Sequence, residues 1–174
     1  MPLVLSHVST TDITSSTSSV NLSLPSDFSI FQLLGEDITG SGTLTFYLRV
    51  STDGGSTFKS GSTDYNMAGR YRYVASNGSG SLNLGVIGGA NHIEMLRNYG
   101  SISDGFDFNY HLYGANSSAL RFCMNGSYTA VDSAKLLHTD LSGSYDATTV
   151  VTDIQISMAS GTIESGKIRL YGVA

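Results

Sequence analysis

The stretch Leu44-Thr45-Phe46-Tyr47-Leu48-Arg49-Val50 decides the fold class of this chain. Large apolar side chains occupy every second position, and polar or amphipathic side chains lie between them. A period of two residues places the two sets on opposite faces of a β-strand. The stretch therefore predicts a strand with one face in a core and the other toward water, as in antiparallel sheets.

The same alternation recurs along the chain and extends the prediction to a whole domain. Its apolar positions are Phe106, Phe108 and Tyr110; Leu120, Phe122 and Met124; Ile154, Ile156 and Met158; and Ile168 and Leu170. Weaker strand candidates cover residues 3–8, 20–24, 28–34, 70–75, 81–86 and 136–139. About ten short strands in one domain predict an all-β fold, an antiparallel two-sheet β-sandwich of the jelly-roll type.

The remaining segments complete the expected organisation. A short helix could form over residues 92–98, and the segment 64–73 is ambiguous. No shift in composition marks a boundary, so we predict one sandwich domain over residues 20–174. Residues 1–19 would precede it as an N-terminal arm or an edge strand. Within them, Ser9–Ser19 is rich in Ser and Thr, which favours a loop or a flexible arm.

Charge and cysteine content exclude several classes of protein. Only 13% of the 174 residues are charged, the formal net charge is −5, and the Lys and Arg residues are scattered. Nucleic-acid binding needs a clustered basic surface, so we expect no nucleic-acid partner. No apolar stretch approaches the length of a membrane span, so we expect no membrane partner either. The single cysteine, Cys123, lies in an apolar run and is predicted to be a buried, inert thiol.

The segment Ser51-Thr52-Asp53-Gly54-Gly55-Ser56-Thr57-Phe58 follows the strand predicted over residues 44–50 and predicts a tight structural hairpin. The Asp53 carboxylate can accept hydrogen bonds from nearby backbone amides, and Gly54 and Gly55 allow positive φ. Phe58 can then fold back onto the sheet. The octapeptide resembles an Asp-box, which is Ser-x-Asp-x-Gly-x-Thr followed by an aromatic residue. Asp-boxes repeat in sialidases and other propellers, mainly as structural hairpins, whereas this chain has a single copy.

A second resemblance begins at the same place. Residues 48–61, followed by Asp64-Tyr65, are similar to a segment that recurs in small structural proteins of tailed phages. Residues 160–172, a Ser-Gly turn leading into a strand that ends Leu-Tyr-Gly, resemble the closing strand of those proteins. The two segments cover about a sixth of the chain. The resemblance implies a virion component with a sandwich fold and does not distinguish head from tail.

Residues able to carry chemistry are few, and we predict no catalytic residue, no metal site, no cofactor and no enzymatic activity. The histidines have no metal-ligand spacing; they are His7, His92, His111 and His138. Acids lie close together at Glu36-Asp37 and at Asp104 with Asp107. Such pairs could act as acid and base or bind calcium, and the alternative is a set of solvated loop charges.

Tyrosines form the other candidate site, because the chain has ten Tyr and no Trp. A tyrosine offers a large contact area and a hydrogen-bonding tip, which suits subunit interfaces and sugar recognition. Ordinary packing within strands is the alternative. The candidates for an interface are Tyr65, Tyr71, Tyr73, Tyr99, Tyr110 and Tyr113.

Together, the residues and the phage resemblance lead to an expected function. We expect a capsid decoration (cement) protein that is made in the host cytoplasm and lies on the outer surface of the virion. Its partners would be the major capsid protein or other virion proteins, and it would form a homo-oligomer, a trimer. The alternative is a tail-fibre tip or a receptor- or carbohydrate-binding module with a glycan ligand. A third reading, a hydrolase of surface glycans, would depend on Asp53, Asp104 or Asp107.

Overall fold

The computed structural model describes residues 4–41, 44–75, 77–99, 105–132 and 135–174, and every regular element within them is a β-strand. The short-period alternation of the sequence explains why strands form throughout. The strands are β1 Leu5–Ile13, β2 Ser19–Ser23, β3 Ile30–Gly40, β4 Leu44–Ser51, β5 Tyr65–Ala75, β6 Gly80–Ala90, β7 Ile93–Tyr99, β8 Phe106–Tyr113, β9 Cys123–Asp132, β10 Lys135–Tyr145, β11 Asp153–Met158 and β12 Ile163–Val173.

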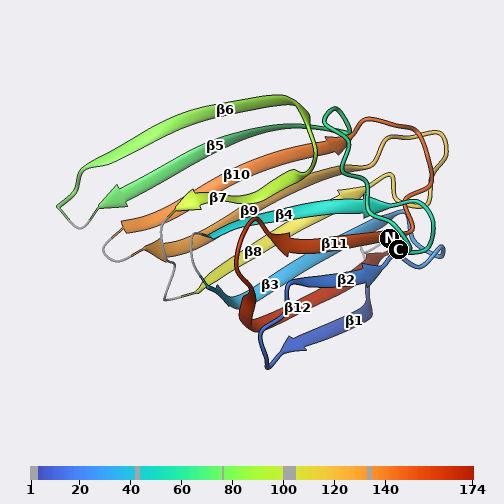
Figure 1. The fold of residues 1–174 in the computed structure, drawn as a ribbon, viewed down its shortest axis with the longest axis horizontal. Helices are drawn as coiled ribbons and strands as arrows, with labels where there is room; N and C mark the ends of the chain where they lie inside the picture. Colours follow the sequence, from blue (N-terminus) through green and yellow to red (C-terminus); the bar gives the residue numbers. More distant parts are fainter. Residues whose placement is uncertain (1–3, 42–43, 76, 100–104, 133–134) are drawn as a thin grey trace.

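These strands form two antiparallel sheets (Figure 1). The large sheet has eight strands in the order β1-β12-β3-β8-β9-β10-β5-β6, and the small sheet has four in the order β2-β11-β4-β7. The predicted all-β, two-sheet β-sandwich is therefore confirmed. A jelly roll has eight strands in two Greek keys. The unequal sheets seen here do not confirm that type.

The core lies between the two sheets, and the strand faces read from the sequence are confirmed there. On β4, Phe46, Leu48 and Val50 are buried, whereas the side chain of Leu44 lies outside the described residues. Leu120 was wrongly placed in the core: it is 62% exposed, because β9 begins only at Cys123. The other apolar positions of the alternating segments are buried: Phe106, Phe108, Tyr110, Phe122, Met124, Ile154, Ile156, Met158, Ile168 and Leu170.

Residues 92–98 do not form the expected helix. Most of them belong to β7, which pairs with β4 at the edge of the small sheet. Ile93, Met95 and Leu96 are all buried. The segment lacks clean alternation, and it forms a strand because it pairs with β4, which is distant in sequence. The ambiguous segment 64–73 is mostly β5, paired with β10 on one side and β6 on the other.

The N-terminal segment contains an edge strand. β1 pairs with β12 from Leu5 opposite Val173 to Ile13 opposite Gly166, with one bulge. The expected loop over Ser9–Ser19 is thus wrong for residues 9–13, which continue the strand. Ile13 is buried at its end, and β2 then begins at Ser19 in the small sheet. The period of two also corrects Cys123, which is exposed because Met124 beside it takes the inner face.

β6 is the outermost strand of the large sheet and lies beyond the small sheet, whose edge strand β7 contacts β5 (Figure 1). β6 is joined along one side to β5, over register pairs from Tyr65–Ala90 to Val74–Gly80. This end of the large sheet carries the surface described below.

Candidate functional site

The Asp53 segment is closed by its own hydrogen bonds. The Asp53 carboxylate accepts from the Ser51 hydroxyl at 2.6 Å, the Thr57 amide at 2.9 Å and the Thr57 hydroxyl at 2.5 Å. The Ser51 hydroxyl in turn accepts from the Gly55 amide at 3.0 Å. Gly54 and Gly55 have φ of 69° and 79°. The hydrogen bonds from Ser51 and Thr57 hold the pKa of the Asp53 carboxyl well below its usual value.

The segment does not join two paired strands, as a hairpin would. It connects β4 of the small sheet to β5 of the large sheet. Tyr65, at the start of β5, stabilises the connection between β4 and β5. Its hydroxyl donates a hydrogen bond to Lys59 O at 3.0 Å and accepts one from the Val50 amide at 2.9 Å. Phe58 is only partly buried. Every oxygen of the Asp53 carboxylate is therefore engaged in holding a crossover between sheets.

Three of the six candidate interface tyrosines are buried, which corrects the interface prediction for them. Tyr65 and Tyr110 are fully buried and Tyr71 nearly so, within this chain's own core. A tyrosine hydroxyl can be buried in a core when it finds a hydrogen-bond partner there. The Tyr110 hydroxyl donates to Met95 O at 2.7 Å and so bonds the large sheet to the small one. Burial raises the pKa of both Tyr65 and Tyr110.

The other three tyrosines are in different situations. Tyr113, which is 37% exposed, lies on the outer face of the large sheet and stacks with His111. Tyr73 is partly buried, and the Lys135 ammonium lies 5.7 Å from its ring centroid. The side chain of Tyr99 lies outside the described residues. The six tyrosines do not form one surface.

The acidic pairs have structural partners where they can be described. The Asp107 carboxylate accepts from the Asp37 amide at 2.9 Å, and Glu36 forms an ion pair with Arg169. Asp104 lies outside the described residues. A search of the described residues finds no group of three or more His, Cys, Asp or Glu side chains able to hold a metal ion. Nor does the described part contain a helix long and apolar enough to cross a membrane.

One polar cluster on the small sheet was not expected from the sequence. Tyr47 of β4 stacks on His92 with ring centroids 3.5 Å apart, and His92 Nε2 lies 3.9 Å from the Glu94 carboxylate. Tyr47 and Glu94 are register partners across β4 and β7. Burial, followed by the charge of Glu94, raises the pKa of Tyr47. A tyrosine with a raised pKa stays protonated at neutral pH, so the cluster packs this edge of the small sheet.

The outer face of the large sheet carries an apolar row along β6. Leu82, Leu84 and Val86 are 61%, 74% and 83% exposed. Leu82 and Leu84 lie opposite Arg72 and Arg70 of β5, and opposite residues share one face of a sheet. Since Tyr71 between these arginines faces the core, the β6 row must face away from it. We call Leu82, Leu84 and Val86 the β6 row.

A second apolar row crosses three strands at the end of the same face. Val74 of β5 lies opposite Leu136 of β10, which lies opposite Val131 of β9. These side chains are 54%, 51% and 41% exposed. We call them the cross-strand row. Val74 is diagonal to Leu82 on the same face, so the two rows lie next to each other, and we call them together the apolar patch.

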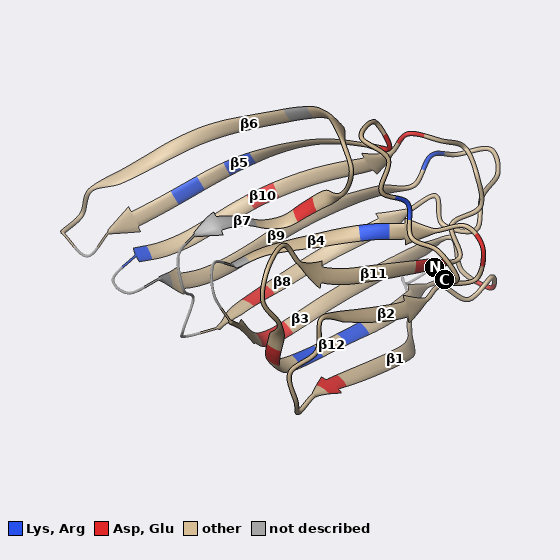
Figure 2. Ribbon diagram, in the orientation of Figure 1, with Lys and Arg blue, Asp and Glu red and all other residues tan. Residues whose placement is uncertain are grey.

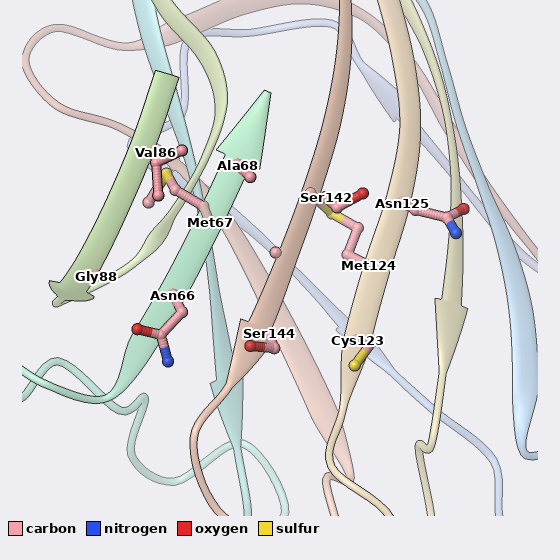
Figure 3. A pocket seen from close by; sticks show the side chains of 11 residues that line it. Asn66, Met67, Ala68, Val86, Gly88, Cys123, Met124, Asn125, Ser142 and Ser144 are labelled. Atoms are coloured by element: carbon pink, nitrogen blue, oxygen red, sulfur yellow. The ribbon is translucent and has the colours of Figure 1, made fainter. Parts of the chain in front are cut away.

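A groove runs along the sheet beside the β6 row (Figure 3). It comprises two adjoining hollows of about 450 and 600 Å³, which share Ala68, Val86, Asn125 and Ser142. Small residues form its floor: Ala68 and Gly69 on β5, and Ser142 and Gly143 on β10. The exposed Cys123 lies on the β9 side.

The lining of the groove is mainly uncharged. Its hydrogen-bonding groups are mainly amides and hydroxyls: Asn66, Asn125, Ser142 and Ser144. Its ionised groups are Arg70 and Asp140, and Asp140 is already paired with Arg72. No histidine lines it among the described residues.

Sequence reasoning missed this surface. The alternation of residues 81–86 predicts a strand, and β6 confirms it. The same alternation in every other segment led us to expect the apolar face to be buried. Only the register of β6 with β5 shows that its apolar side chains lie on the face turned away from the small sheet, where no described residue covers them. A weak signal was available: no charged or proline residue occurs between Gly80 and Ala90.

Comparisons with protein families and with curated proteins find no match for this chain. Among solved structures, it is similar to a marine alginate lyase from Aplysia kurodai, with 6% sequence identity and a TM-score of 0.26. The similarity covers 87% of this chain and 71% of that chain. A TM-score of this size does not establish a common fold, so the lyase carries no argument about function.

Proposed function

We propose that this chain is a non-enzymatic structural protein of a tailed-phage virion, a capsid decoration protein that binds neighbouring capsid subunits on the outer surface of the head. The observation that carries the proposal is the apolar patch formed by six neighbouring exposed side chains on the outer face of the large sheet. Exposed apolar patches of this kind mark surfaces for association. The assignment to a phage particle is supported by the resemblance of residues 48–61 and 160–172 to phage structural proteins.

The cross-strand row is the part of the patch best placed for a capsid. Val74, Leu136 and Val131 lie at the end of the large sheet, at the tips of three adjacent strands. A surface at one end of the sandwich can insert between capsid subunits while the rest remains in solvent. A decoration protein that binds only the assembled shell stabilises the shell by mass action.

Cryo-electron microscopy of the virion and reconstitution test the proposal. Purified protein is added to capsids that lack it, and bound protein is measured by sedimentation. The variant Leu136→Lys should bind at least tenfold more weakly, because it places a charge in the row. The control Thr129→Lys, an exposed position on the same face of β9, should bind as the wild type does. Density for this chain on the tail alone, or equal binding by both variants, contradicts the proposal.

A second candidate function is a receptor- or glycan-binding module at the tip of a tail fibre. The observation that favours it is the groove, whose amides and hydroxyls suit the hydroxyl groups of a sugar. A glycan array with the wild type and with Ser142→Leu, which fills the floor of the groove, separates the two candidates. A sugar bound by the wild type and lost in Ser142→Leu would establish the second function, whereas no sugar bound would remove it.

A further inference from the structure

We infer that β6 pairs with β6 of a second copy of this chain, antiparallel about a two-fold axis at Leu84, so that two large sheets join into one continuous sheet. This inference concerns the chain's own association and does not depend on where the protein lies in a virion. Three features of the described residues carry it: a free strand edge, the spacing of the β6 row, and the absence of charge on β6.

The first feature is the edge itself. β6 is the last strand of the large sheet. Ten of its eleven residues pair with β5 on one side, and Gly89 forms a bulge next to its last residue, Ala90. The backbone N–H and C=O groups on the other side form a template for another strand. Proteins that keep such an edge free protect it with charged residues or proline. β6 has neither, and it appears without a Lys, Arg, Asp or Glu in Figure 2.

The second feature is the spacing of the apolar side chains. Leu82, Leu84 and Val86 are evenly spaced about Leu84, on one face. An antiparallel pairing centred on Leu84 places Leu84 opposite Leu84 of the second copy, and Leu82 opposite its Val86. Apolar pairs directly across two strands are the unit of sheet stabilisation. The row is therefore complementary to itself, which is what a two-fold interface requires.

The third feature is charge, which selects the second copy over the other edges of the molecule. Two β6 strands meet without any ionised side chain, so no charge is buried or repelled. The edge strand at the far side of the large sheet, β1, carries Asp12, which pairs with Lys167 of its own chain. β7, at one edge of the small sheet, carries Glu94. Pairing β6 with either edge would set an acid beside an apolar row. The remaining edge strand, β2 (Ser19–Ser23), is uncharged but has only five residues, against the eleven of β6.

The oligomeric state of the full chain tests the inference. Sedimentation equilibrium of the wild type should show a concentration-dependent dimer. Leu84→Lys should weaken the dimer at least tenfold, because the two-fold axis sets two ammonium groups side by side. Thr129→Lys should leave it unchanged. Circular dichroism should show both variants folded, since the Leu84 side chain is exposed in the single chain.

A cross-link fixes the register even if Leu84→Lys fails to fold. Residues opposite each other in an antiparallel pair have Cα atoms about 4.5–5.5 Å apart, within the range that a disulfide spans. In a Cys123→Ser background, Leu84→Cys should form a disulfide-linked dimer under mild oxidation, and Thr129→Cys should not. A monomer at all concentrations overturns the inference. So does an oligomer, a trimer included, that survives Leu84→Lys and yields no Leu84→Cys cross-link.

Discussion

At the scale of single residues, Asp53 shows how one side chain closes a long connection. Its carboxylate accepts three hydrogen bonds from Ser51 and Thr57, and the Thr57 amide is among the donors. A tight turn that links two sheets needs such a local acceptor, because its backbone amides have no strand partner. The role predicted for Asp53 depends on these bonds.

We therefore expect Asp53→Ala to lower the melting temperature while leaving any binding function intact. Because the pKa of Asp53 is lowered in the folded chain, its contribution is present above the unfolded value of about 3.9. That contribution is lost as the pH falls further, so the difference from wild type should shrink below about pH 4. Thermal melts from pH 3 to pH 7 measure it. Asp27→Ala, which removes an exposed carboxylate from another turn, is the control. Unchanged melting with loss of activity would instead make Asp53 a functional residue.

Phe122 and Leu120 provide a matched pair for testing the core. Phe122 is fully buried and Leu120, two residues earlier, is 62% exposed. Removing a buried phenyl ring leaves a cavity, so Phe122→Ala should lower the free energy of unfolding by about 3–5 kcal/mol. We expect Leu120→Ala to change it by less than about 0.5 kcal/mol. Phe46→Ala should behave like Phe122→Ala. Denaturant titration distinguishes these outcomes, and wild-type stability in Phe122→Ala would mean that the faces are reversed.

At the scale of elements, β1 and β6 are the two edges of one sheet and differ in what they carry. β1 carries mostly polar side chains, with a half-exposed Leu5 at its start and the buried Ile13 at its end, and an ion pair joins its Asp12 to Lys167 of β12. β6 has no charged residue with which to form such an ion pair, and it presents apolar side chains to solvent. The charged edge strand, β1, ends the large sheet, whereas the uncharged edge strand, β6, is the one that we infer pairs with a second copy.

Deleting residues 1–13 tests the contribution of β1. The truncation removes the ladder from Leu5 to Ile13 and uncovers the edge of β12. For a chain of this length, about 1 kcal/mol of stability corresponds to roughly 2–4 °C in melting temperature. We expect a folded protein whose melting temperature falls by more than about 5 °C in circular dichroism. An unchanged melting temperature would make β1 a detachable arm, as one of the two sequence alternatives held.

At the scale of the whole molecule, one core joins the two sheets. It receives buried side chains from both, and the Tyr110 hydroxyl crosses it to Met95 O. The expectation is a single cooperative unfolding transition, as for most domains of this size. Far-ultraviolet circular dichroism follows the backbone, and near-ultraviolet signals follow the tyrosines, of which Tyr65, Tyr110 and Tyr128 are buried.

The two probes should give coincident transitions, and the transition temperature should rise with protein concentration, because association through β6 stabilises the folded chain. Leu84→Lys should abolish the concentration dependence while keeping the probes coincident. An early transition seen by only one probe would show instead that the β5–β6 end of the large sheet unfolds separately from the core.

The sequence by itself determined the fold class and the faces of the strongest strands. Alternation is a local property: with a period of two, Phe46 and Leu48 must share a face whatever the strand pairs with. The turn at Asp53 could also be predicted, because its donors and acceptor lie within seven residues of sequence, from Ser51 to Thr57. These inferences required no knowledge of distant partners.

The tertiary structure alone decided which strands meet and which faces are covered. Residues 93–99 became a strand because β4 pairs with them, and Tyr65, Tyr71 and Tyr110 entered the core because their strands lie opposite the small sheet or beside its edge. β6 alternates as the core strands do, yet its apolar row is exposed. The physical reason is that a period of two separates the faces of a strand without saying which face another layer will cover. That depends on pairing between residues far apart in sequence and on where each sheet ends.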